Sequence, residues 1–344
     1  MRASSAWLPV ARAVTLLWAG AVATVAHAAV RVTPPTILLA TPAATQQLLV
    51  TVLTSAAREY DVTREATYRF SISGIAEIDA FGSLRPLADG ETELEIRAGG
   101  DAARVPVVVR GLAQPPPVSF EQQVVPILTK AGCNAGGCHG KAEGKNGFKL
   151  SVFGFDPDAD FDALVKQSRG RRIDRTIPAA SMVLRKATAE TPHGGGQRLP
   201  PESLPYRRLK RWIAEGVNAG GNHVRPAISI EIEPKERILL SRGTQQLQVT
   251  AEDDTGRRWC VTAEAEFSSN AAGIADVDAR GLIQAGSTPG EAAVLVRYMG
   301  SVDVCTITLP RPDAPFTRPP EVNFIDTPVW NKLERLGIQP TPPA

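Results

Sequence analysis

The 344-residue chain has few of the features that would point to the common functional classes. Aromatic residues make up only 6% of it, the formal charge is +2, and no apolar run after residue 28 is long enough to cross a membrane. The balanced charge excludes a dedicated nucleic-acid binder, because such proteins carry a strongly basic surface. The chain also lacks a G-x-S-x-G elbow, a dinucleotide-binding fingerprint and an H-E-x-x-H helix. The machinery of ordinary hydrolases and dehydrogenases is therefore missing, and no catalytic residues are assigned.

The first residues have the pattern of an export signal. Arg2 and Arg12 precede the apolar run "AVTLLWAGAVATVA", and "AHA" ending at Ala28 offers small residues for cleavage. We predict a signal peptide over residues 1–28, with an uncleaved membrane anchor as the alternative. After cleavage no transmembrane segment would remain. Export predicts a location in the periplasm or cell envelope, where cysteines end up oxidised or chemically occupied.

Comparison of the chain with itself shows a repeat. The segment "ATQQLLVT" from Ala44 recurs as "GTQQLQVT" from Gly243, and "IAEID" from Ile75 recurs as "IADVD" from Ile274 at the same offset. A unit of roughly 80 residues therefore occurs twice. Both copies alternate apolar and polar residues in short runs separated by turn residues, which is typical of a β-sandwich.

Proline- and glycine-rich stretches divide the chain around the two copies. We predict sandwich domains over residues 30–111 and 226–310, joined through a Pro-rich linker over 112–118 and a different domain over 119–217. Residues 311–344 read as a Pro-rich tail with a short helix. The intervening domain should begin with a helix capped by Ser119 and end with a helix whose apolar face is formed by Tyr206, Leu209, Trp212 and Ile213.

The stretch "AGCNAGGCHG" over residues 131–140 carries the candidate chemistry. Cys133 and Cys138 offer two thiols, and His139 directly follows the second. Covalent haem attachment needs two thiols that add to the porphyrin and an adjacent imidazole that meets the iron. The spacing here is C-x4-C-H, a rarer variant of C-x-x-C-H. A structural zinc site and a plain disulfide between Cys133 and Cys138 are the alternatives.

Several quoted segments resemble known families. The run "ILTKAGCNAGGCHGKAEGKNGFKLSVFGFDPDADF", with "PHGGGQRL" and "RRLKRWIAEG", resembles the planctomycete-type cytochrome c domain. The two repeats resemble bacterial Ig-like group 2 modules. "EVNFIDTPVWNKLERLGIQP" resembles the opening of a large domain of unknown function that follows in such proteins, and we expect that domain to be absent from this chain.

The resemblance implies a multidomain protein with two all-β Ig-like sandwiches flanking an all-α cytochrome c-like domain. It implies one covalent haem c held by Cys133, Cys138 and His139, and electron transfer to a redox partner protein in the cell envelope. An electron carrier is favoured over an enzyme, with the sandwiches as spacers or adhesion modules. The alternatives are a non-redox envelope protein that binds other proteins or polysaccharide, and a haem accessory to a separate catalytic domain.

The second axial ligand of the iron should come from the later part of the insert. A methionine in an M-P-P segment is common there, but this chain has Leu199 in "RLPP". His193 in "TPHGGGQR" is the first candidate, because the glycines after it would allow close approach to a porphyrin. Met182 in "ASMVLRK" is the alternative.

Other clusters have plainer interpretations. Cys260 and Cys305, both in the second sandwich, are candidates for a disulfide that would stabilise it by about 2–4 kcal/mol. The aspartates from Asp156 to Asp162 lack the glycine and glutamate of an EF-hand, so helix capping is expected instead. The arginines Arg169, Arg171, Arg172 and Arg175 either pair with haem propionates or form a solvated basic face.

Overall fold

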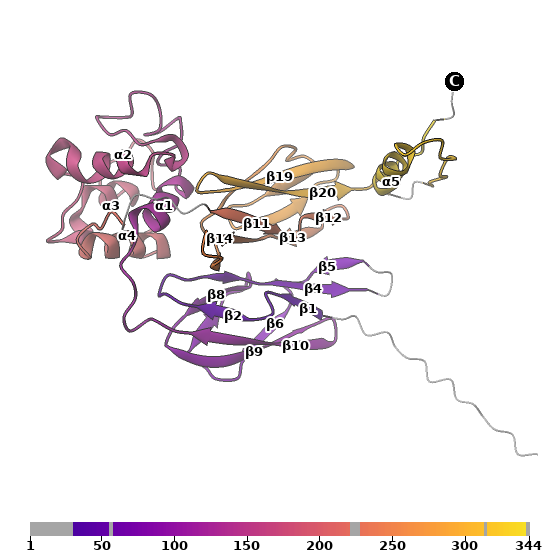
Figure 1. Cartoon of the computed structure of the whole chain (residues 1–344), viewed down its shortest axis with the longest axis horizontal. Coiled ribbons are helices and arrows are strands. Elements are labelled where there is room, and N and C mark those ends of the chain that lie inside the picture. The colour runs from indigo at the N-terminus through magenta and orange to yellow at the C-terminus, as the bar shows by residue number, and fades with distance from the viewer. Residues whose placement is uncertain (1–29, 55–57, 221–227, 313–314, 342–344) are drawn as a thin grey trace, which may run out of the picture.

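The computed structural model describes residues 30–54, 58–220, 228–312 and 315–341. The predicted signal peptide, residues 1–28, lies outside this part of the chain. The described residues form two β-modules that lie side by side, with helices α1–α4 grouped at one end and helix α5 at the other (Figure 1).

Module 1, residues 30–109, consists of three small sheets. Their strand orders are β1-β4-β5, β2-β10-β9-β6 and β3-β8-β7. All neighbouring strands are antiparallel except β2 and β10, which are parallel. The strands are β1 Val30–Thr33, β2 Ile37–Leu39, β3 Gln46–Gln47, β4 Leu49–Leu53, β5 Glu59–Asp61, β6 Thr67–Phe70, β7 Ala76–Ile78, β8 Ser83–Pro86, β9 Gly90–Ala98 and β10 Asp101–Val109.

Module 2, residues 229–309, repeats this topology strand for strand. Its sheets have the orders β11-β14-β15, β12-β20-β19-β16 and β13-β18-β17, and β12 pairs with β20 in parallel. The strands are β11 Ser229–Glu233, β12 Glu236–Ile238, β13 Thr244–Gln246, β14 Gln248–Glu252, β15 Arg258–Cys260, β16 Glu266–Ser269, β17 Ala275–Val277, β18 Leu282–Ala285, β19 Gly290–Tyr298 and β20 Ser301–Leu309.

Both module cores follow from the alternation along the strands. In β9 every second residue is buried, and Leu94 and Ile96 are fully enclosed. The matching strand β19 buries Val294 and Val296 in the same way. Each such side chain contributes about 1.5–3 kcal/mol when it leaves water. The repeat in the sequence is thus a repeat of one core.

The prediction of an all-α cytochrome c-like domain over residues 119–217 is wrong. The structure is mostly β, with six sheets, and the four helices of this region are too short to form an all-α domain. They span five to eleven residues, and single helical turns and loops make up most of the rest. The cause is local, because glycines in left-handed conformations such as Gly132 and Gly154 interrupt the helical backbone. The helices are α1 Val125–Lys130, α2 Pro157–Phe161, α3 Met182–Ala187 and α4 Leu204–Ala214.

We call residues 118–217 the helical segment. Its first and last parts pack together, since the rings of Phe120 and Trp212 lie 5.3 Å apart between centroids. The predicted apolar face of the last helix is confirmed, as Tyr206, Leu209, Trp212 and Ile213 are all buried on α4. Capping is also confirmed for Asp156, whose carboxylate accepts from the backbone of Ala159 at the start of α2.

The two modules contact each other through equivalent positions. The backbone N–H of Gln47 donates to the Cys260 sulfur at 3.4 Å, and the equivalent N–H of Gln246 donates to the carboxylate of Asp61, which is the counterpart of Cys260. Arg280 lies over the ring of its own counterpart, Phe81, at 4.0 Å. Such reciprocal contacts are those of a two-fold interface between identical partners. The modules therefore pack about a pseudo-two-fold axis.

This packing explains why the predicted disulfide between Cys260 and Cys305 is absent. Both residues are free thiols. Cys260 is on β15, in the three-stranded sheet that faces module 1, whereas Cys305 is on β20, in the four-stranded sheet and the core of module 2. The two thiols thus belong to different sheets, and Cys260 serves the contact between modules instead.

The helical segment is attached to both modules through Arg208 of α4, which is 7% exposed. Its guanidinium forms an ion pair with Glu264 of module 2 and donates to the carbonyl oxygen of Ala43 in module 1 at 2.7 Å. One buried side chain therefore joins the three parts of the chain.

Lys130, the last residue of α1, makes a second attachment. Its ammonium donates to the carbonyl oxygens of Ala265 and Ala279 in module 2, the latter at 2.6 Å, and lies 5.0 Å from the ring centre of Phe267. Burial lowers the pKa of Lys130 to about 8, although nearby carboxylates oppose the shift. Helix α1 is thus held against module 2 just before the cysteine motif begins.

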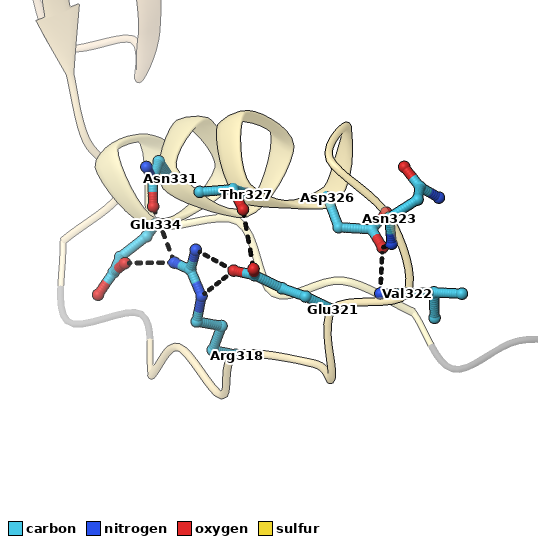
Figure 2. A network of polar contacts seen from close by, with 8 residues as sticks. All are labelled: Arg318, Glu321, Val322, Asn323, Asp326, Thr327, Asn331 and Glu334. Carbon is cyan, nitrogen blue, oxygen red and sulfur yellow. Dashed lines mark hydrogen bonds and ion pairs between the residues drawn. The ribbon is translucent and has the colours of Figure 1, made fainter.

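The C-terminal helix α5, Asp326–Leu336, packs on the opposite end of module 2 (Figure 1). A polar network shapes the loop that leads into it (Figure 2). Arg318 pairs with Glu321 at 2.8 Å and donates to the Asn331 side chain at 2.8 Å. Asp326 accepts from the backbone of Val322 at 2.6 Å. The loop therefore folds back on its own helix.

Within the described ranges, no helix combines the length and apolar character that crossing a bilayer requires.

Replacement of Arg208 by methionine should lower the free energy of unfolding by about 3 kcal/mol, because Glu264 and the Ala43 carbonyl would lose a buried partner. Urea denaturation measures the change. Arg104→Met is the matched control, since its ion pairs with Glu93 and Glu95 are exposed and its loss should cost less than about 1 kcal/mol. Equal effects of the two substitutions would show that Arg208 does not join the domains.

A lysine whose pKa is lowered by folding binds its proton less tightly when folded, so its contribution to stability rises with pH from about 8 towards the unfolded value near 10.4. The native chain should therefore gain about 2 kcal/mol of unfolding free energy over Lys130→Met between pH 8 and pH 10. Urea denaturation at several pH values measures this difference. Lys149→Met, which removes an exposed ammonium, should show no such trend. A constant difference between native chain and Lys130→Met would contradict the burial of the Lys130 ammonium.

Candidate functional site

The helical segment encloses a cavity of about 480 Å³. Apolar side chains from α1 and α4, among them Leu128 and Leu209, form its inner wall. The loop after α1 and the loop after α3 complete it. The residues predicted to carry the chemistry all line this one cavity: Cys133, Cys138, His139, Met182 and His193.

Backbone hydrogen bonds fold the loop over residues 131–140 into successive tight turns. The backbone N–H of Cys133 donates to the carbonyl of Leu128 in α1 at 2.8 Å, so the loop begins where the helix ends. The backbone N–H of His139 donates to the Cys133 carbonyl at 3.0 Å. The turns need small residues, because a Cβ at Gly140 would lie 2.1 Å from the Asn134 carbonyl oxygen. The glycine after His139 is therefore required for the loop to bring both thiols to the cavity.

The two thiols of the motif are not bridged to each other. Cys138 is buried and Cys133 half-buried. Burial, reinforced by the neighbouring Cys138, raises the pKa of Cys133 to about 11. At neutral pH Cys133 is thus a thiol rather than a thiolate, which argues against its sulfur ligating a metal ion directly.

The imidazoles of His139 and His193 face the same space from two different loops. Their ring planes are parallel within 8°, and their centroids lie 6.4 Å apart. His139 Nδ1 lies 3.0 Å from the Phe148 carbonyl oxygen, and His193 Nδ1 lies 2.9 Å from the Gly196 carbonyl oxygen. A carbonyl only accepts, so each Nδ1 carries a proton, and in the neutral ring the lone pair then lies on Nε2.

Burial is the main reason that the pKa of His139 lies below its usual value, and the nearby His193 lowers it further. The neutral imidazole, which is the form able to ligate a metal, is therefore favoured near neutral pH. Gly195 provides the space for the second ring, since a Cβ at that position would lie 3.0 Å from His193 Cε1. Of the three glycines after His193, Gly195 is the one that makes room for the imidazole.

Phe148 and Arg172 support His139 from behind. The Phe148 ring lies 4.6 Å from the His139 ring, and the Arg172 guanidinium lies 4.6 Å from the centre of the Phe148 ring. Arg172 is 4% exposed and donates to the carbonyl oxygens of Gly147, Ala163 and Gln167. Arg172 thus fixes the backbone at Gly147, next to the Phe148 carbonyl that orients His139. Metal-ligating histidines are commonly oriented through their second nitrogen in this way.

The structure sorts the other sequence candidates. Met182 lines the cavity, but its side chain is 38% exposed. Arg171 and Arg172 line the cavity, Arg175 lines a neighbouring hollow, and Arg169 lines neither. Sequence reasoning missed Phe148 and the structural use of Arg172, because neither belongs to a motif and both act through contacts distant in the chain.

The expectation of a metal-binding group held within a cytochrome fold is corrected. In the part of the chain that the structure describes, no group of three or more His, Cys, Asp or Glu side chains could hold a metal ion. This also removes the zinc alternative for the cysteine motif, because structural zinc needs four protein ligands. What the cavity offers is a pair of imidazoles beside a pair of thiols.

No family model matches the chain, and no curated protein matches it. Solved structures of bacterial surface proteins show distant similarity. Domains 5–6 of the S-layer protein SbsC are 11% identical, with a TM-score of 0.32, over 82% of this chain and 97% of that one. For domains 1–6 of SbsC the values are 9% and 0.22 over 76% of this chain, which spans 23% of that fragment.

A C-terminal fragment of intimin, solved with the intimin-binding domain of its receptor, is 10% identical with a TM-score of 0.17, over 82% of this chain and 64% of that one. TM-scores this low establish no shared arrangement of domains. Surface-layer assembly and receptor binding are properties of those proteins.

Arg172→Met should lower the free energy of unfolding by about 2–4 kcal/mol, because three backbone carbonyls would lose a buried donor. The neighbouring exposed Arg171 is the matched control, and Arg171→Met should change stability by less than about 0.5 kcal/mol. In the nuclear magnetic resonance spectrum, the His139 ring signals should shift in Arg172→Met alone. An unchanged His139 signal would show that Arg172 does not orient the imidazole.

Proposed function

We propose that the cavity of the helical segment holds one covalently attached haem c, with Cys133 and Cys138 forming the thioether bonds and His139 and His193 as the axial ligands. The observation that carries the proposal is the pair of parallel imidazoles, each with its Nδ1 proton on a carbonyl, beside two unbridged thiols.

The residues present fit this group by their chemistry and spacing. His139 and His193 would hold the metal of this group from two loops, since their rings are parallel within 8° and their centroids lie 6.4 Å apart. A porphyrin supplies four nitrogens to its iron, so the protein needs only two ligands, and a pair of histidines suffices. Between His193 and Met182, the ring geometry favours His193.

When bound, such a haem exchanges single electrons between two iron oxidation states. The residues of this chain would set how it does so. His139 and His193 would both hold the group, which would leave water and small ligands no free place on it. Leu128 and Leu209 would exclude solvent from one face, and Phe148 and Arg172 would hold His139 in place. This arrangement supports electron transfer with a redox partner protein rather than catalysis.

The wider setting proposed for the protein is the cell envelope. The export pattern in residues 1–28 supports it. Thioether bonds would occupy Cys133 and Cys138. The two modules would then serve as a rigid spacer or as adhesion modules that carry the haem-binding segment.

A second candidate function, an envelope binding protein without redox activity, is favoured by a separate groove. Between module 1, module 2 and α5 lies a hollow of about 650 Å³. Tyr60, Ile238 and Leu240 expose apolar surface there, and Arg58 and Arg335 also line it. Such a mixed polar and apolar groove suits a peptide or polysaccharide segment.

A haem stain after denaturing electrophoresis separates the two functions. Expressed with a haem-attachment system, the native chain should retain haem and Cys133→Ala/Cys138→Ala should not. The matched control is Cys260→Ala/Cys305→Ala, which removes the two thiols of module 2 and should stain like the native chain. A colourless native chain, with a known cytochrome stained in parallel, would overturn the haem proposal and leave the binding function.

His193→Met should raise the reduction potential by about 0.1 V or more, because thioether sulfur favours the reduced iron more than imidazole does. Met182→Leu should leave the potential and the absorption spectrum unchanged. Redox titration of both purified variants measures the effect. The reverse pattern would assign Met182 as the second axial ligand.

A further inference from the structure

A second hollow of about 370 Å³ adjoins the cavity of the helical segment. The two share Arg171, Met182, Lys186 and Thr191 in their walls, so they meet along one side. Neither motif thiol and neither imidazole lines the second hollow. The second hollow therefore joins the cavity on a side that carries neither the thiols nor the imidazoles.

Positive charge gathers in this second hollow. Four cationic side chains line it, against one acidic side chain, Asp174. The Asp174 carboxylate accepts from the backbone of Thr176 at 2.9 Å and of Ile177 at 2.8 Å, so it is engaged in its own turn. The four cations are Arg171, Arg175, Arg185 and Lys186.

Three of these cations have no carboxylate within ion-pair distance among the described residues. Arg185 pairs with Glu190 at 3.3 Å. Lys186 donates only to the carbonyl oxygen of Pro192, and Arg171 and Arg175 have no ion pair there. Like charges gathered without counterions repel one another, and an anionic ligand would relieve that repulsion.

The helical segment as a whole is basic, unlike the rest of the chain. It contains 16 Lys and Arg residues against 10 Asp and Glu residues, whereas the complete chain has a formal charge of only +2. The excess is thus confined to the part that forms the cavity. A surface built only for solubility has no reason to concentrate charge in this way.

We propose that the second hollow binds the carboxylates of the ligand whose apolar body fills the neighbouring cavity, with Arg171, Arg175 and Lys186 as their partners. The inference rests on the proposed function, in which that ligand is haem and the carboxylates are its two propionates. Arginine suits this role because its planar guanidinium binds a carboxylate through two parallel hydrogen bonds. The thiols of the cavity and the cations of the second hollow would then hold different parts of the same ligand.

The test separates carboxylate binding from covalent attachment. Full-length Cys133→Ala/Cys138→Ala protein is titrated with haemin and with haemin dimethyl ester, which has the same ring but no carboxylates, and binding is followed by absorbance. Haemin should bind at least about tenfold more tightly than the ester, since a charge-assisted hydrogen bond contributes about 1.5–3 kcal/mol.

Adding Arg171→Gln, Arg175→Gln and Lys186→Gln to this protein should reduce haemin binding to the level of the ester and leave ester binding unchanged. The matched control adds Lys149→Gln, Lys166→Gln and Arg169→Gln, which removes the same number of exposed cations from the same segment without touching either hollow. This control should retain the preference for haemin.

Each outcome decides a separate claim. Equal binding of haemin and ester by the parent protein overturns the carboxylate site and leaves the haem cavity intact. A preference that survives the three substitutions overturns the assignment to these cations. If the parent protein binds neither compound, and the native chain does not stain for haem, the proposed function fails and the inference with it.

Discussion

The packing of two copies of one module about a pseudo-two-fold axis is the constraint on which the rest of the structure depends. Gln47 N–H meets Cys260, and its counterpart Gln246 N–H meets Asp61, so the same pair of positions is used twice. Asp61 is half-buried at this contact, and the loss of water around its carboxyl raises its pKa. The half-buried carboxyl is tolerated there because backbone and side-chain donors, including Thr63, satisfy it.

This pairing determines where the intervening segment must lie. The chain leaves module 1 after β10 and has to return to begin module 2 beside it, so residues 118–217 form a closed excursion at one end of the pair (Figure 1). Their ends are joined, since Val118 N donates to the Glu215 carboxylate at 2.7 Å. Arg208 and Lys130 then attach the segment to the modules. The cavity is thus built on a base that both modules hold.

Hydrogen bonds between loops also fix the geometry of the site. Its helices are too short to enforce geometry by themselves, so individual hydrogen bonds do so. The carbonyls of Phe148 and Gly196 accept from Nδ1 of His139 and His193 and so orient the two rings. Glycines allow the tight turns of both loops. Arg172 donates to three backbone carbonyls and so holds together loops that no long helix supports.

Local patterns were enough to predict some parts of this structure. The apolar face of α4 and the cap at Asp156 follow from residues a few positions apart, and the structure has both. The prediction of an all-α domain is wrong, because left-handed glycines such as Gly132 and Gly154 interrupt the segments that have helical spacing. The disulfide between Cys260 and Cys305 was wrong as well, because their separation in space depends on which sheet each strand joins.

The sequence by itself determined which residues repeat, where the thiols and histidines stand along the chain, and where the excess positive charge lies. Only the tertiary structure decided that the rings of His139 and His193 are parallel, that Arg172 supports one of them, and that four cations share a hollow beside the cavity. These relations join loops that are distant in the chain. Their geometry is set by hydrogen bonds and burial that exist only once these loops have packed together in the folded segment.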